Sequence, residues 1–248
     1  LARHAQELRD AGLKRVNISL DTLRPERFAA ITRQGKLSDV LDGIAAAHTA
    51  GLEPVKINTV VIRGMNDDEI VDLARRTVGD GWHVRFIEWM PVGAAAGAAV
   101  PEESHTATGA DWNTDVVTAA EMRAAIESAL GPLEPAHSDG AGPARYFQLP
   151  GAAGTVGFIT PLSEHFCNRC NRLRLTADGQ IRPCLLSDLE SDLRTPLRQG
   201  AGVAEIKALL KDIIARKPER HHLEQAHESA HESAHKHARK RAMSEIGG

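Results

Sequence analysis

The residues best suited to chemistry are three cysteines that lie close together in the chain. Cys167, Cys170 and Cys184 have the spacing C-x₂-C-x₁₃-C, and a hairpin over 171–184 would return the third thiolate to the first two. Two kinds of site remain open on this spacing. One is a structural zinc ion completed by His165 or another ligand, which spacing alone favours. The other is an iron–sulfur cluster, which with only three cysteines would keep one iron open to substrate.

Positive charge surrounds these cysteines. Residues 167–184 contain one acidic side chain and four arginines, which are Arg169, Arg172, Arg174 and Arg182. Arg172 and Arg174 fall on one face of a predicted strand, and paired guanidinium groups suit phosphate or the carbonyl edge of a purine. A solvated strand face would show the same arginines, but beside an open metal centre they favour an anionic ligand.

Three strand-like runs near the N-terminus, 16–20, 55–62 and 84–90, carry polar side chains. These are Asn17, Ser19, Asp21, Lys56, Asn58, Arg85 and Glu88. Polar residues on one face of successive parallel strands suggest a barrel lumen that binds a polar ligand at the carboxyl ends of the strands. End-of-strand caps or structural ion pairs would give the same pattern. Arg85 and Met90 have opposite parity, so a bulge or strand end must separate them if both point inward.

The elements that position these residues alternate between helix and strand up to residue 91. Helices are predicted over 4–12, over 37–51 and from 66 to about 80, and this spacing indicates parallel β–α–β units. A further helix is predicted over 119–130. After residue 143 the prediction changes to short strands at 145–149, 154–159, 171–176 and 180–184, with a turn at Asp178-Gly179. One or two helices follow within 189–215, broken near Pro196 and Gly200–Gly202.

Composition excludes several classes of protein. The 42% hydrophobic and 25% charged residues exclude a wholly disordered chain. The net charge of −3 and the 4% aromatic content predict no nucleic-acid partner. No apolar run is long enough to predict a membrane span. Three clustered cysteines and no signal peptide favour a reducing compartment, the cytoplasm.

Several stretches together resemble one known family. They include Val16-Asn-Ile-Ser-Leu-Asp21, Val55-Lys-Ile-Asn58, Arg63-Gly-Met-Asn-Asp-Asp68, Arg85-Phe-Ile-Glu88, Phe166-Cys-Asn-Arg-Cys-Asn-Arg-Leu-Arg174, Asp192-Leu-Arg-Thr-Pro-Leu197 and Ile246-Gly-Gly248. These stretches resemble the MoaA family, the GTP 3′,8-cyclases of molybdenum cofactor biosynthesis, which are radical S-adenosylmethionine (SAM) enzymes. The resemblance runs from about residue 4 to the end of the chain, and it is weakest over 92–117 and 219–242.

The resemblance implies a mechanism. An N-terminal 4Fe–4S cluster cleaves SAM reductively to a 5′-deoxyadenosyl radical, which takes the hydrogen from C3′ of GTP. The C3′ radical adds to C8, giving (8S)-3′,8-cyclo-7,8-dihydroguanosine 5′-triphosphate. A second 4Fe–4S cluster with three cysteine ligands binds GTP at its open iron. The resemblance therefore replaces zinc with a cluster at the three cysteines.

The resemblance also implies a role for individual residues. The ligands of the C-terminal 4Fe–4S cluster would be Cys167, Cys170 and Cys184. GTP would be bound by Lys56, Arg85, Arg172, Leu173 and Arg174. SAM would contact Ser19 and Met90, and the terminal Gly247 and Gly248 would support catalysis.

The implied fold is α/β, an incomplete radical-SAM-type partial (β/α) barrel followed by a C-terminal Fe–S-binding α+β region. Four regions are expected: the barrel segment over residues 1–91, a variable loop and helix over 92–142, the Fe–S and GTP region over 143–218, and a His-rich tail over 219–248. The family's C-x₃-C-x₂-C motif and its Gly-Gly-Glu-Pro segment do not occur in this sequence. We therefore expect a fragment that lacks the radical-generating cluster and is not competent alone.

Two other functions stay open on the sequence. One is a non-catalytic zinc or Fe–S binding module, and the other is a different radical SAM enzyme with a related C-terminal cluster. The expected partners are GTP, the downstream cyclic pyranopterin monophosphate synthase by pathway, and a second copy in a homodimer. The tail has histidines at 227, 231 and 235, a helical spacing that would suit a stray divalent metal, although a polar spacer is favoured.

Overall fold

The structure is a computed structural model that describes residues 1–90, 116–137, 142–187 and 189–220. These residues form two compact units, one ending at Glu164 and the other beginning at His165. Within the described residues, no helix has the length and apolar character that crossing a membrane requires.

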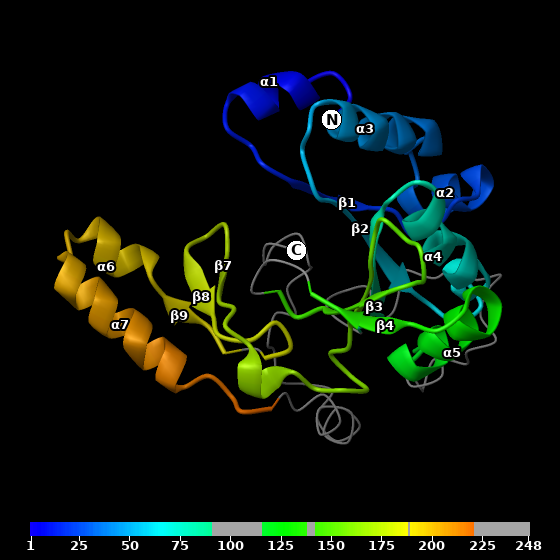
Figure 1. Cartoon of the computed structure of the whole chain (residues 1–248). Coiled ribbons are helices and arrows are strands. Elements are labelled where there is room, and N and C mark those ends of the chain that lie inside the picture. The colour runs from blue at the N-terminus through cyan, green and yellow to red at the C-terminus, as the bar shows by residue number, and fades with distance from the viewer. Residues whose placement is uncertain (91–115, 138–141, 188, 221–248) are drawn as a thin grey trace. The chain divides into compact units, whose positions relative to one another are not determined.

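The first unit is built on a six-stranded sheet in the order β1-β2-β3-β6-β5-β4 (Figure 1). Four strands run parallel: β1 (Val16–Ser19), β2 (Val55–Val61), β3 (His83–Glu88) and β6 (Val156–Ile159). Two further strands extend the sheet in antiparallel pairing, β5 (Arg145–Gln148) and β4 (Glu134–Ala136). The mixed α/β fold with parallel strands is therefore confirmed.

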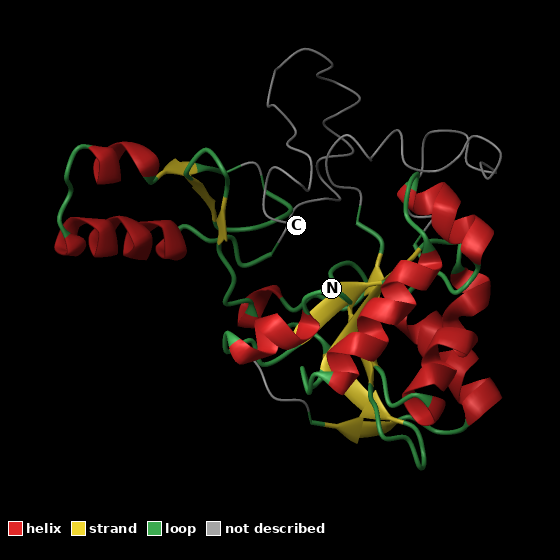
Figure 2. Ribbon diagram, turned by 90° about the horizontal axis from the view of Figure 1, so that it is seen from above, coloured by secondary structure: helices red, strands yellow, loops and turns green. Residues whose placement is uncertain are grey.

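Helices connect and cover these strands. They are α1 (Ala5–Asp10), α2 (Pro25–Thr32), α3 (Leu37–Thr49), the short 3₁₀ turn η1 (Asp67–Glu69), α4 (Ile70–Gly79) and α5 (Ala119–Leu130). Figure 2 shows α3, α4 and α5 gathered on one side of the sheet.

The hydrophobic core lies between that face of the sheet and the helices. The strands supply alternate residues, with Val84 and Phe86 on β3 fully buried and Arg85 between them facing the other way. Leu73 on α4 and Met122 on α5 pack into the same core. The opposite face of the sheet is thus left to the polar residues.

Trp82, the residue just before β3, packs into the hydrophobic core. Its side chain is only 6% exposed, and the guanidinium carbon of Arg76 lies 5.6 Å from the ring centroid. The contact ties the last turn of α4 to the start of the strand.

The second unit contains a small antiparallel sheet in the order β7-β8-β9. Its elements are η5 (Cys167–Arg169), β7 (Arg174–Leu175), β8 (Gln180–Arg182), β9 (Ser191–Asp192), α6 (Arg194–Arg198) and α7 (Val203–Ala215). The hairpin turn between β7 and β8 falls at Gly179, which has φ +83°, as the Asp-Gly signal predicted.

Several sequence predictions differ from the observed elements. The strand predicted over 171–176 is correct only for 174–175, so Arg172 precedes β7 rather than sharing a strand face with Arg174. Pro196 does not break a helix, because it lies in the first turn of α6, where its missing N–H costs no helical hydrogen bond. Three observed elements, α2, β4 and β9, were not predicted from the sequence.

The strands β5 and β6 belong to the first sheet. Both were expected within the C-terminal region 143–218, but β6 pairs with β3 on one side and with β5 on the other. The second compact unit begins only after them, at His165.

Candidate functional site

The sheet register brings polar residues into rows on the face away from the helices. One row runs across five strands through Ser19, Asn58, Arg85, Gly157 and Tyr146. The parallel strands thus gather side chains that lie far apart in the sequence onto one surface.

A second row lies next to the first and contains Asn17, Lys56 and His83. The His83 Nδ1 atom lies 2.9 Å from the Thr155 hydroxyl oxygen. Burial lowers the pKa of His83, and the Lys56 ammonium lowers it further. At neutral pH, His83 is therefore uncharged, and the cations of this surface are Lys56 and Arg85.

Each of these two cations contacts an uncharged group. Arg85 donates from Nη2 to Oδ1 of Asn17 at 2.7 Å, while its buried Nε has no hydrogen-bond partner among the described residues. Lys56 is 7% exposed, and its ammonium lies 5.4 Å from the centroid of the Tyr146 ring. Such a pair of cations can bind a polyanion.

Ser19 and Met90 lie at the carboxyl ends of their strands. Ser19 is the last residue of β1 and is exposed. Met90 is two residues beyond the end of β3, which stops at Glu88. The end of β3 therefore lies between Arg85 and Met90. A bulge or a strand end was needed there if both residues are to point inward, because they have opposite parity along the strand.

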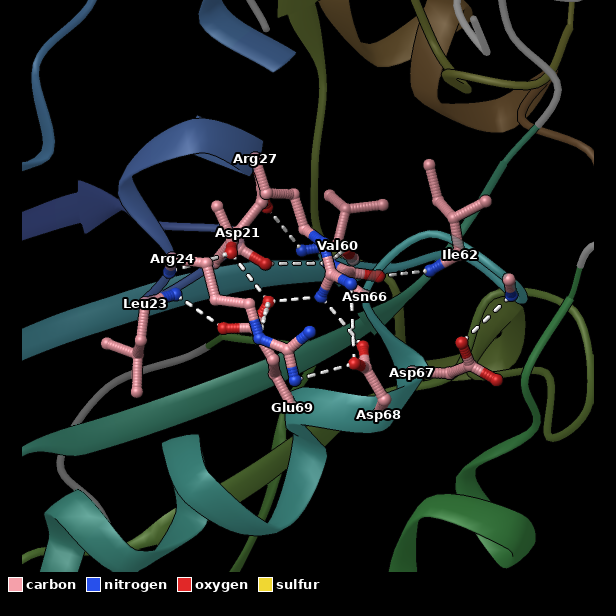
Figure 3. A network of polar contacts seen from close by, with 12 residues as sticks. Asp21, Leu23, Arg24, Arg27, Val60, Ile62, Asn66, Asp67, Asp68 and Glu69 are labelled. Carbon is pink, nitrogen blue, oxygen red and sulfur yellow. Dashed lines mark hydrogen bonds and ion pairs between the residues drawn. The ribbon is translucent and has the colours of Figure 1, made fainter. Parts of the chain in front are cut away.

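A buried polar network holds the segment that follows Ser19 (Figure 3). Glu69, 1% exposed, accepts hydrogen bonds from the Thr22 hydroxyl and the Leu23 amide at 2.6 Å each and pairs with Arg27. Asn66 donates to the carbonyl oxygens of Asp21 and Val60.

Asp21, which shares the face of Ser19, is part of this network and accepts a hydrogen bond from the Val60 amide at 2.8 Å. Burial raises the pKa of Asp21, and the hydrogen bond from Val60 lowers it by a smaller amount. Asp21 therefore links the segment after β1 to β2. This is the structural role, an end-of-strand cap, that the sequence left open as an alternative to ligand binding.

Glu88 is also structural. It is fully buried on the helix side of β3 and accepts hydrogen bonds from the backbone amides of Ala119, Leu162 and Ser163 and from the Ser163 hydroxyl. Ala119 is the first residue of α5, so the carboxylate also lies at the positive end of that helix.

The three cysteines of the second unit are free thiols, and Cys167 and Cys170 lie near enough to Cys184 to affect its thiol. Burial raises the pKa of the Cys184 thiol, and the nearby sulfur atoms of Cys167 and Cys170 raise it further. At Cys170, burial also opposes ionisation, but hydrogen bonds from the Arg172 amide and Lys217 outweigh it and lower the pKa.

Lys217 joins the end of α7 to this loop. Its Nζ atom lies 3.3 Å from the Cys170 Sγ atom and 2.7 Å from the Arg172 carbonyl oxygen. The predicted arginines lie beside the same thiols. Burial lowers the pKa of Arg174, and Arg172 and Arg182 lower it further, while Cys184 and Cys170 act in the opposite direction.

Arg172 is exposed, while Leu173 and Arg174 are half-buried. A cavity of about 520 Å³ adjoins the loop and is lined by His165, Cys167, Asn168, Glu219 and Arg220. This is a volume suited to a small-molecule ligand.

The donor set suits a cluster. Within the described residues, no three His, Cys, Asp or Glu side chains converge to hold one metal ion. A 4Fe–4S cluster takes each thiolate on a different iron, so its ligands do not need to converge. Three thiols beside Lys217, Arg172 and Arg174 also match the negative charge of a thiolate-bound cluster.

Some contacts could not be found from sequence. Tyr146 and Lys217 belong to no recognisable motif. Tyr146 meets Lys56, and Lys217 meets Cys170, only through tertiary packing. The exposed polar face of the first strand was the signal that pointed to Asn17. Gly247 and Gly248, together with the His-rich tail from 221 on, lie outside the described residues.

Comparison with known proteins identifies the family. The family described as Radical SAM superfamily matches residues 1–77, and that described as Molybdenum Cofactor Synthesis C matches residues 82–223. The GTP 3′,8-cyclase of Pelotomaculum thermopropionicum is 51% identical over 100% of this chain and 70% of its own length. Those of Moorella thermoacetica and Heliobacterium modesticaldum are each 48% identical, over 98% and 100% of this chain and 68% and 70% of their own lengths. The chain therefore belongs to the GTP 3′,8-cyclase family of radical SAM enzymes.

Proposed function

We propose that this chain binds GTP for 3′,8-cyclisation in molybdenum cofactor biosynthesis. In the first unit, Lys56 and Arg85 hold the triphosphate. The observation that carries this role is that two cations share the polar face of a parallel sheet, with Lys56 over the Tyr146 ring and Arg85 on the Asn17 amide. Neither the ring nor the amide carries a charge, so these two contacts do not weaken the attraction of the cations for phosphate.

In the second unit, Cys167, Cys170 and Cys184 would hold a 4Fe–4S cluster, and Arg172, Leu173 and Arg174 would contact GTP. When bound, the cluster would supply an iron that the three thiolates leave open to substrate. Lys217 orients the Cys170 sulfur, and the arginines beside the thiols attract the anionic nucleotide.

Ser19 and Met90, at the carboxyl ends of β1 and β3, would contact SAM. Ligands of parallel α/β sheets bind at this end of the strands, which agrees with a partial barrel whose lumen is the polar face. The network around Glu69 and Asn66 holds the segment just after Ser19 and so keeps this strand end in place. Roles for Gly247 and Gly248, the downstream synthase, a homodimer and a cytoplasmic location stay predictions of the resemblance.

GTP titration of the anaerobically reconstituted chain tests the triphosphate role. Lys56→Ala and Arg85→Ala should each weaken GTP binding by about tenfold or more, because each removes a charge-assisted contact to phosphate. Lys14→Ala is the matched control, since Lys14 is exposed. Unchanged GTP affinity in both Lys56→Ala and Arg85→Ala would overturn the assignment.

The cluster's role is tested separately by electron spin resonance. GTP should perturb the signal of the reduced cluster, and Arg172→Ala/Arg174→Ala should abolish the perturbation. A signal that GTP leaves unchanged in the unsubstituted chain would contradict GTP binding at the cysteine loop.

A further inference from the structure

Gly157 has an unusual position between two large side chains of the polar face. It is the register partner of Arg85 on one side and of Tyr146 on the other. A Cβ atom at this position would lie 3.1 Å from the Cγ atom of Arg85 and 3.1 Å from the Cε1 atom of the Tyr146 ring. Both side chains therefore lie across the glycine, in space that any other residue would occupy.

Tyr146 reaches from this row to a cation in the next row. The face of its ring is directed toward the Lys56 ammonium, with 5.4 Å between the nitrogen and the ring centroid. The negative face of an aromatic ring attracts a cation, and the attraction is stronger where water is excluded. Lys56, at 7% exposed, meets that condition.

Arg85 is fixed on its other side by Asn17. The hydrogen bond from Nη2 to the Asn17 Oδ1 atom sets the direction of the guanidinium plane, and the Cγ atom of the same side chain passes over Gly157. The buried Nε hydrogen has no partner among the described residues.

We propose that Tyr146 and Gly157 are positioning residues that set the separation and direction of the Lys56 and Arg85 cations and so match them to the triphosphate of the nucleotide. The proposal rests on the proposed function, because that function gives the two cations their ligand. Gly157 supplies the space and Tyr146 supplies an uncharged anchor. An acidic anchor in the same place would hold Lys56 but would also repel phosphate.

The test compares the affinities of GTP and GMP for the full chain by calorimetric titration under anaerobic conditions. The ratio of the two affinities isolates the β- and γ-phosphates from the rest of the nucleotide. Tyr146→Leu and Gly157→Ala should each lower this ratio by about threefold to tenfold, because the cations lose their fixed geometry. Tyr146→Phe, which keeps the ring face, should keep the ratio within about twofold of the unsubstituted chain.

The outcomes separate the proposal from a merely structural role. A loss of fold would weaken GMP and GTP binding together and leave the ratio unchanged, which would overturn the proposal. A Tyr146→Phe variant as defective as Tyr146→Leu would also overturn it, since the ring face would then not be the contact. If the unsubstituted chain does not prefer GTP to GMP, the proposed triphosphate site itself fails.

Discussion

At the scale of single residues, hydrogen-bond partners distinguish the buried carboxylates from the cations that we propose to bind phosphate. Glu69 and Glu88 are both almost fully buried, and each accepts several hydrogen bonds from nearby backbone and side chains. Arg85, by contrast, retains an unpartnered buried N–H among the described residues. The sequence showed that Arg85 and Glu88 were polar, but only the direction of each side chain tells their roles apart.

Lys217 gives a prediction at this scale. Lys217→Gln should lower the reduction potential of the bound cluster by tens of millivolts, because it removes a positive charge and weakens a hydrogen bond to the Cys170 sulfur. Roughly 43 mV corresponds to 1 kcal/mol for a one-electron couple, which is about the strength of such a bond.

Spectroelectrochemical titration measures this potential. Lys217→Arg should retain most of the unsubstituted value. Lys211→Gln is the control, because Lys211 is exposed on α7, the helix that ends just before Lys217. Equal potentials for Lys217→Gln and Lys211→Gln would show that the contact does not influence the cluster.

At the scale of elements, the helices with strong end signals were predicted best. The prediction for α5 has the observed bounds, because Thr118 and Glu121 form a capping box at its start and Gly131 follows its end. The missed helix α2 is short, although Pro25 at its first turn was an available signal. The missed strand β4 contains Pro135, a residue that disfavours a strand prediction. The proline is tolerated there because β4 is an edge strand of the sheet.

The capping box of α5 predicts a dependence of stability on pH. Hydrogen bonds from the Thr118 amide, the Arg63 guanidinium and the Thr118 hydroxyl lower the pKa of Glu121 from 4.5 to about 2. Between these values the unfolded chain binds more protons than the folded chain, so this stabilisation is lost as the pH falls from about 4.5 toward 2.

Glu121→Gln should flatten the dependence of unfolding free energy on pH in this window. The difference should be about 1 kcal/mol or less, because the side chain is half exposed and solvent screens its charge. Urea unfolding at a series of acidic pH values measures it. Parallel curves for Glu121→Gln and the unsubstituted chain would contradict the assignment.

The network after Ser19 predicts a larger effect on stability. Arg27→Ala should lower the free energy of unfolding by about 2 kcal/mol, because it leaves the buried Glu69 carboxylate with less compensation. Arg75→Ala, which removes only an exposed pair with Asp72, should change it by about 0.5 kcal/mol or less. Urea unfolding measures both free energies. Equal losses in Arg27→Ala and Arg75→Ala would show that the burial of Glu69 adds nothing to the strength of its ion pair.

At the scale of the whole molecule, the parallel strands were predictable and the closing strands of the sheet were not. The runs that became β1, β2 and β3 are local patterns with helices between them. The pairing of β6 with β3 joins segments about seventy residues apart, and no local pattern specifies that contact. Tyr146 could therefore not be assigned to the polar face, since β5 reaches it only through β6.

Cluster content gives a prediction for the whole chain. After anaerobic reconstitution, the chain should contain about four iron atoms and show a broad visible absorption band, because its three cysteines provide for one cluster. Cys170→Ser should reduce the iron content markedly. A colourless protein that binds one zinc ion instead would support the metal-binding module.

The position of Trp82 makes the two units separately observable. The tryptophans of the sequence are at 82, 89 and 112, whereas the cysteines begin at 167. Trp82 is buried in the first unit, so its emission should report the melting of the large sheet. Visible absorption of a bound cluster would report only the second unit. One sample heated under argon could thus yield two independent melting curves, and their order would show which half of the fold loosens first.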